Sequence, residues 1–182
     1  MNTSTNTPHE VTKAIEIFKL SSEGKSKVLA ELKRYESKQS AVLPALYVAQ
    51  AENKGHINAS VIRELSMVMD IPESQINEVF TFYTMYNKKN VGRYHIQICR
   101  TLSCMLNGAQ DLTEHICTQL NVKLGEVTDD GQFTVSEAEC LGSCGTAPMM
   151  QITGSGDVAA YDKYHEDLSR ETAMSIIRGL KR

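Results

Sequence analysis

The chain has 182 residues, of which 41% are hydrophobic and 23% are charged, and its formal net charge is −3 at pH 7. This composition is typical of a globular protein with one large or two small domains, and it excludes an intrinsically disordered chain. The net negative charge and the lack of a basic stretch disfavour nucleic-acid binding, and no apolar run approaches the roughly 18 residues that a membrane-spanning helix needs.

The opening segment, MNTSTNTPHEVTK, has neither the basic part nor the apolar part of a secretory signal. We therefore expect a cytoplasmic protein. In that reducing compartment the five cysteines are expected to be ligands, nucleophiles or core residues rather than partners in disulfides.

The front part of the chain has no cysteine and predicts a series of helices. Residues 1–9 are polar and are expected to form a flexible tail. Over residues 10–90, apolar residues recur at helical spacing, with Gly55 and Pro72 at positions where helices commonly end and begin. The predicted helices lie at 10–20, 21–37, 41–55, 58–70 and 71–87. Together they predict a small helical bundle.

From residue 91 the hydrophobic period changes to two residues. Tyr94, Ile96 and Ile98 alternate with less apolar residues, which predicts a strand. The remaining predicted elements are a helix at 105–121, two short strands around the Asp130–Gly131 turn, a strand–turn–strand unit at 148–161 and a closing helix at 166–182. The order, β-α-β-β-β-α or nearly so, predicts a layered α/β structure for residues 91–182, so the whole chain is predicted to be of the α+β class.

Two pairs of cysteines lie at the ends of predicted strands. Cys99 and Cys104 form a C-x4-C motif, and Cys140 and Cys144 form a C-x3-C motif. Loops at strand ends of one sheet can converge, so these thiols are candidates for one shared site. Their chemistry leaves three kinds of site open: a 2Fe–2S cluster, a zinc ion, and free or disulfide-bonded thiols. Zinc sites prefer C-x2-C, although C-x4-C is within their range, and the common ferredoxin cysteine runs are absent.

Small and charged neighbours of the cysteines would suit a cluster. Gly142 and Gly145 would let the backbone approach closely and point N–H groups at sulfur. Arg100 is either a cation that offsets the charge of a reduced cluster or a solvated surface residue. Glu139 is expected to face water, because an inward carboxylate would oppose added negative charge.

The segment DGQFTVSEAECLGSCGTAP, residues 130–148, resembles the signature of the thioredoxin-like 2Fe–2S component of respiratory complex I, which is the E subunit of bacterial NADH–quinone oxidoreductases. Four more segments resemble this family: LPALYVAQAENKGHI, VMDIPESQINEVFTFY, TFYTMY and VGRYHIQICRTLSCMLNGA. The resemblance covers about residues 25–181. His56 departs from it, because the family often has an aromatic residue there.

The resemblance implies a helical N-terminal domain over residues 10–90, followed by a thioredoxin-like α/β domain over residues 91–182 that carries one 2Fe–2S cluster. The four implied ligands, two for each iron, are Cys99, Cys104, Cys140 and Cys144. No catalytic residue is implied.

The resemblance also implies an electron-transfer subunit of NADH–quinone oxidoreductase. The sequence has no Gly-rich phosphate loop and no recognisable flavin site, so FMN and NADH would be bound by a partner flavoprotein subunit with which the cluster exchanges single electrons. The cluster would be a side branch of the peripheral arm, which would hold the chain at the cytoplasmic membrane without inserting it. Two alternatives are a diaphorase subunit of an NAD-dependent hydrogenase or formate dehydrogenase, and a free-standing carrier ferredoxin. The helical front part disfavours the carrier.

Five residues outside the motif are assigned to packing. Phe80, Phe82, Tyr83 and Tyr86 gather near one predicted helix end and are expected to fill the core between the two halves, with a partner contact as the alternative. Cys117 is expected to be a buried structural thiol.

Overall fold

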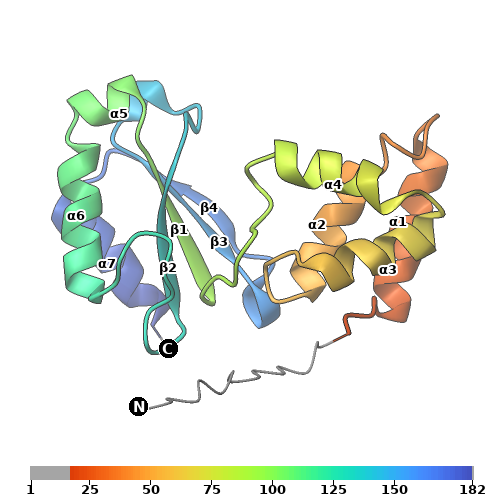
Figure 1. The fold of residues 1–182 in the computed structure, drawn as a ribbon. Coiled ribbons are helices and arrows are strands. Elements are labelled where there is room, and N and C mark those ends of the chain that lie inside the picture. The colour runs from red at the N-terminus through yellow and green to blue at the C-terminus, as the bar shows by residue number, and fades with distance from the viewer. Residues whose placement is uncertain (1–16, 182) are drawn as a thin grey trace, which may run out of the picture.

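The computed structural model describes residues 17–181, which form a helical half followed by a half built on a β-sheet (Figure 1). The expected tail at 1–9 and most of the helix expected at 10–20 lie outside these residues. The described part of that helix, residues 17–20, is not helical. No helix within residues 17–181 is both long and apolar enough to cross a membrane.

The helical half contains four of the five predicted helices: α1 (Ser22–Arg34), α2 (Val42–Glu52), α3 (Ala59–Met69) and α4 (Glu73–Phe82). Local chemistry explains where they begin. The Ser21 and Asn58 side chains accept hydrogen bonds from the first-turn backbone of α1 and α3, and Pro72 directly precedes α4. Their apolar faces meet in one core, made of Leu20, Val28, Ala41, Val42, Ala45, Leu46, Ala49, Ile57, Val61, Ile62, Leu65, Met69, Ile71, Ile76 and Tyr86.

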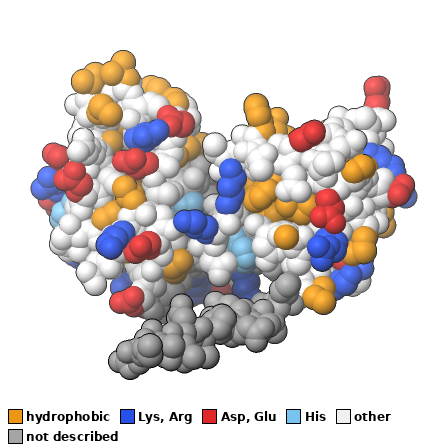
Figure 2. Space-filling model, viewed as in Figure 1, with side chains coloured by type: hydrophobic (Ala, Val, Ile, Leu, Met, Phe, Trp, Pro, Cys, Tyr) orange, Lys and Arg blue, Asp and Glu red, His pale blue; other side chains and the backbone are white. Residues whose placement is uncertain are grey.

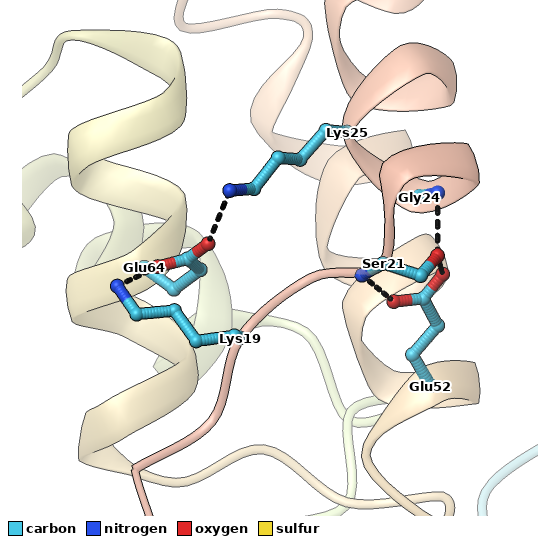
Figure 3. A network of polar contacts seen from close by, with 6 residues as sticks. All are labelled: Lys19, Ser21, Gly24, Lys25, Glu52 and Glu64. Carbon is cyan, nitrogen blue, oxygen red and sulfur yellow. Dashed lines mark hydrogen bonds and ion pairs between the residues drawn. The ribbon is translucent and has the colours of Figure 1, made fainter.

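A buried carboxylate fastens the segment before α1 to the rest of the bundle (Figure 3). Glu64 on α3 is 2% exposed and forms ion pairs with Lys19 at 2.8 Å and Lys25 at 3.4 Å. Burial acts to raise the pKa of Glu64, but the two lysines outweigh it and hold the pKa below its ordinary value. Nearby, the Ser21 backbone N–H and hydroxyl donate to the Glu52 carboxylate at 2.8 and 2.6 Å. The start of the described chain is therefore tied to both α2 and α3.

The second half contains a four-stranded sheet in the order β2-β1-β3-β4, in which β1 is parallel to β2 and antiparallel to β3. Helices α6 and α7 lie on one side of it and the helical half lies on the other (Figure 1). The elements are β1 (Tyr94–Cys99), α5 (Leu102–Leu106), α6 (Ala109–Leu120), β2 (Phe133–Ala138), η1 (Cys144–Thr146), β3 (Met150–Gly154), η2 (Gly156–Val158), β4 (Asp162–His165) and α7 (Arg170–Leu180).

The two faces of this sheet differ in polarity because side chains alternate along each strand. Ile96, Val135 and Ile152 point to the face that packs on α6 and α7 and are fully buried. His95 and Ser136 lie on the opposite face, where the imidazole Nε2 and the hydroxyl are 2.7 Å apart. The predicted α+β class is confirmed.

Three local predictions in this half are wrong. The helix expected at 105–121 is two helices, α5 and α6, because Gly108 adopts a left-handed φ of 86° between them. The first β-prone stretch around Asp130–Gly131 is not a strand, and Val127 forms only an isolated bridge to Thr134. After the Gly-Ser-Gly turn the chain forms the short helix η2 before β4 begins at Asp162.

The two halves meet at Gly55 rather than at the aromatic cluster. Gly55 has a φ of 82°, and an added Cβ would lie 2.7 Å from the Ser155 side chain and 2.9 Å from Val91. Phe80, Tyr83 and Tyr86 pack in the helical core instead of between the halves. Phe82 is 78% exposed, so its prediction as a core residue is wrong.

Candidate metal centre

The structure brings both cysteine pairs to one edge of the sheet. Cys99 ends β1 and Cys140 follows β2, and because these strands are parallel neighbours their carboxyl ends meet at the same edge. The Arg100 N–H donates to the Ala138 carbonyl at 3.0 Å, which continues the pairing of the two strands into the loops. Cys104 lies on α5 and Cys144 begins η1, two short helices that pack together. The predicted convergence of the two strand-end loops is therefore present.

Hydrogen bonds cross between the two loops at the sulfurs. The Leu141 N–H donates to the Cys99 sulfur, and the Thr101 hydroxyl interacts with both Cys99 and Cys140. The Ser103 side chain hydrogen-bonds to Cys144. Sequence analysis missed Thr101, Ser103 and Leu141, although all three lie inside the two cysteine motifs.

The two pairs differ in exposure. Cys99 and Cys104 are 2% and 1% exposed, whereas Cys140 and Cys144 are both exposed, with their sulfurs 3.7 Å apart. A group held by all four thiols would have one side inside the protein and the other at the surface. Nothing in the spacing of the motifs predicts this asymmetry.

Each pair contains one thiol whose pKa is lowered and one whose pKa is raised. Burial raises the pKa of Cys104 to about 11. Burial also acts to raise the pKa of Cys99, but hydrogen bonds from Thr101 outweigh it and the pKa is lowered. At the surface, the Gly142 N–H lowers the pKa of Cys140, and the neighbouring Cys140 sulfur raises the pKa of Cys144. Metal ligands are thiolates, so loading such a site releases protons.

The glycines and charged residues beside the cysteines have distinct roles. Gly142 adopts a φ of 87°, a conformation that favours glycine, and its N–H points at the Cys140 sulfur. An added Cβ at Gly145 would meet nothing within 4 Å, so protein packing gives no reason for glycine there. The Arg100 guanidinium donates to the Glu139 carboxylate at 2.6 and 3.2 Å. Glu139 is exposed, as predicted, and its charge is balanced by Arg100 rather than directed at the sulfurs.

The donor set fits an iron–sulfur group with two ligands at each end. Thiolates are the ligands of such clusters, and hydrogen bonds to sulfur help set their potentials. Within residues 17–181, no three His, Cys, Asp or Glu side chains gather as the ligands of one metal ion. The four thiols are arranged as two pairs in adjacent loops. Cys117 lies apart from them on α6, packs partly buried against the core of this half, and has its pKa raised by burial.

The family model described as thioredoxin-like [2Fe-2S] ferredoxin matches residues 28–181. The chain belongs to this family. A thioredoxin-like [2Fe-2S] ferredoxin carries one 2Fe–2S cluster, which is the cofactor of this chain. The match includes both cysteine pairs and most of the helical half.

Curated relatives of this ferredoxin are named as E subunits of NADH-quinone oxidoreductases. The chain is 41% identical over 148 residues to the NADH-quinone oxidoreductase E subunit of Rickettsia felis, with 80% of this chain and 84% of that protein covered. It is 38% identical over 144 residues to one such E subunit of Rhizobium meliloti, covering 79% and 80%. It is 40% identical over 169 residues to the E subunit of Rickettsia bellii, covering 91% and 96%.

A solved structure shares the fold of this ferredoxin. The chain resembles a chain of NAD+-reducing [NiFe]-hydrogenase in the air-oxidized state with a TM-score of 0.62 and 22% identity. The likeness covers 77% of this chain but only 22% of the hydrogenase chain, so this ferredoxin corresponds to about a fifth of that protein. At this identity the likeness concerns the fold alone.

Proposed function

We propose that this chain is the electron-transfer subunit of an NADH–quinone oxidoreductase, and that it exchanges single electrons with the FMN of a partner flavoprotein subunit. Its 2Fe–2S cluster would be held by Cys99, Cys104, Cys140 and Cys144. The observation that carries the proposal is the meeting of both cysteine pairs at one edge of the sheet, where Leu141, Thr101 and Ser103 hydrogen-bond across the two loops. The curated relatives, at 38% to 41% identity, support the choice of this enzyme complex.

The protein's part in this function is to hold the cluster and to enclose one side of it. When bound, the cluster supplies one-electron chemistry, and no general acid, base or nucleophile of this chain is required. Cys99 and Cys104 would bind from the buried side, and Cys140 and Cys144 from the surface side. The N–H groups of Leu141 and Gly142 would donate to sulfur and so favour the negatively charged reduced state.

The chain would consist of two domains. We propose a helical domain over residues 10–90 and a cluster domain over residues 91–182, preceded by a tail at 1–9. The two separate sets of buried residues support a boundary near residue 90, because one set ends at Tyr86 and the other begins at Tyr94.

The chain would work inside a larger assembly. We infer that it belongs to the peripheral arm of the oxidoreductase, on the cytoplasmic side of the membrane, where the flavoprotein subunit binds FMN and NADH. It would contact neither lipid nor nucleic acid directly.

A diaphorase subunit of an NAD-dependent hydrogenase is the second candidate. The shared fold with the NAD+-reducing [NiFe]-hydrogenase is the observation that favours it. The subunits that co-purify with the native chain would distinguish the two candidates: quinone-reductase subunits support the first, and hydrogenase subunits support the second.

Electron paramagnetic resonance at low temperature tests the main proposal. After reduction with dithionite, the purified chain should give a rhombic S = 1/2 signal, with two irons and two sulfides per chain. The same signal should form when NADH is added together with the flavoprotein subunit, and should not form with NADH alone. Reduction by NADH alone, or no reduction in the presence of the flavoprotein, would contradict the proposed role.

A further inference from the structure

Charged side chains of both signs lie directly beside the paired cysteines. Arg100 follows Cys99 in the chain, and Glu139 precedes Cys140. On the face of the molecule shown in Figure 2, basic and acidic side chains lie next to each other below α5. The charged residues of the two cysteine segments, 99–108 and 136–149, are Arg100, Glu137 and Glu139.

A single guanidinium contacts both carboxylates. Arg100 donates to Glu139 at 2.6 and 3.2 Å, and its Nη1 lies 3.9 Å from Glu137 Oε2. Its backbone N–H also donates to the Ala138 carbonyl, between the two acidic residues. All three charged side chains line the same cavity of about 550 Å³ as Cys140. Arg100 therefore fixes where both carboxylates lie relative to the cysteine loop.

These ion pairs contribute little to folding, but their charges lie close to the cysteines. The side chains of Arg100, Glu137 and Glu139 are 55%, 35% and 69% exposed, and exposed ion pairs add little stability. Consecutive residues lie about 3.8 Å apart along the chain, whereas salt screens a charge over about 10 Å at about 0.1 M. Arg100 and Glu139 are therefore within electrostatic reach of the cysteines next to them. One positive and two negative charges give this group a net negative charge.

We propose that Arg100 is a positioning residue for electron transfer: it holds Glu137 and Glu139 in place, offsets their charge, and so raises the reduction potential of the 2Fe–2S cluster. Reduction adds one electron and makes the cluster more negative, so nearby negative charges disfavour the reduced state and positive charges favour it. Arg100 acts through the two carboxylates and needs no contact with the cluster. This inference rests on the proposed function, because it takes Cys99 and Cys140 as ligands.

The direction of the shifts in potential distinguishes this role from a structural one. If the Arg100–Glu139 ion pair only tied the two loops together, removing either partner would release the same contact. Arg100→Gln and Glu139→Gln would then shift the potential in the same direction, and the double variant would resemble either single variant. An electrostatic role predicts shifts in opposite directions, because the two variants remove charges of opposite sign.

A spectroscopic redox titration of the cluster-loaded chain in about 0.1 M salt tests the proposal. Arg100→Gln should lower the equilibrium constant for reduction about threefold, and Glu139→Gln should raise it about threefold. The double variant has the same net charge beside the cysteines as the wild type, so its constant should stay within about 1.5-fold of the wild-type value. Arg100→Lys keeps the positive charge and should also remain near wild type.

Arg93→Gln is the matched control. Arg93 pairs with Asp157 at the same 2.6 Å as Arg100 with Glu139, but it precedes β1 whereas Arg100 follows it. The strand between them spans about 20 Å, or about two screening lengths in about 0.1 M salt, so Arg93→Gln should leave the potential unchanged. In about 1 M salt the screening length falls to about 3 Å, and the shifts of Arg100→Gln and Glu139→Gln should shrink.

The outcomes separate this proposal from the proposed function. Opposite shifts that cancel in the double variant and shrink with salt support the role of Arg100. Shifts in one direction, an Arg93→Gln shift as large as that of Arg100→Gln, or an Arg100→Lys variant that behaves like Arg100→Gln would overturn it, as would unchanged potentials. The proposed function stands in each of these cases, because the wild-type chain carries a reducible cluster. A wild-type chain that assembles no cluster with two irons and two sulfides contradicts the proposed function instead.

Discussion

The two halves of this ferredoxin differ in where they place charged and reactive groups. In the helical half, a buried carboxylate, Glu64, is neutralised by Lys19 and Lys25 and fastens one segment to another. In the sheet half, the four paired thiols lie at the end of β1 and in the segments that directly follow β1 and β2, and the core beneath them is apolar. Rigid strands position such loops without constraining their chemistry. The comparison indicates that the polar contacts of Glu64 stabilise the helical half, whereas the polar contacts at the cysteine site shift the pKa values of the thiols.

The largest expected effect comes from removing a buried thiol of the sheet half. Cys104→Ala should prevent stable cluster assembly, because it removes one of four proposed ligands from the enclosed side of the site. Cys117→Ala should retain two irons and two sulfides per chain. Iron and sulfide analysis with the electron paramagnetic resonance spectrum measures both. Equal cluster loss in the two variants would overturn the ligand assignment.

Removing the positive charges that pair with Glu64 should destabilise the helical half. The double variant Lys19→Ala/Lys25→Ala leaves a carboxylate that is 2% exposed without a counter-charge. We expect a loss of about 3 kcal/mol in the free energy of unfolding, measured by urea denaturation. Lys27→Ala is the control: its partner Glu23 is 77% exposed, so the loss of stability should be far smaller than in the double variant. Similar losses in both variants would mean that burial of Glu64 contributes nothing.

Acidification should weaken the sheet half through His95. Burial lowers the pKa of His95 to about 4, below its ordinary 6.5, so the folded protein holds this imidazole neutral. Below about pH 6.5 the unfolded chain binds a proton that the folded chain does not, and stability falls as the pH drops towards 4. Through His95 alone, the free energy of unfolding at pH 5 is about 2 kcal/mol lower than at pH 7.

Urea denaturation at the two pH values measures this loss. His95→Gln should reduce it by that amount, whereas His115→Gln on α6 should leave it unchanged. If the wild type and His95→Gln lose stability equally between pH 7 and pH 5, His95 does not titrate in this way.

The smallest expected effect is on the reduction potential. Thr101→Val removes a hydroxyl that contacts the sulfur of Cys99 at 3.3 Å. The reduced state carries more negative charge and gains more from this hydrogen bond, so the midpoint potential should fall by tens of millivolts, on a scale of about 59 mV per 1.4 kcal/mol for one electron. A spectroscopic redox titration measures it. Thr118→Val, whose hydroxyl bonds only within α6, is the control and should not shift the potential.

Sequence patterns predicted most of the helices and strands because each depends on local contacts. The helical period of apolar residues and the polar residues before the helices placed α1 to α4 within a few residues. The predictions of helix boundaries and of burial failed where a single residue departs from the pattern of its neighbours. Gly108 ends one helix and starts another through its left-handed φ, and Phe82 faces outward although its neighbours Phe80 and Tyr83 pack inward.

The amino-acid sequence by itself determined the chemistry of this protein: two cysteine pairs, their spacing, and the glycine that turns an N–H towards sulfur are local features of the chain. Only the tertiary structure decided that the pairs meet, because the meeting depends on the parallel pairing of β1 with β2, which are separated by α5 and α6. It also decided that Cys99 and Cys104 are enclosed while Cys140 and Cys144 face outward. Burial is a property of the packed molecule, and no short motif encodes it.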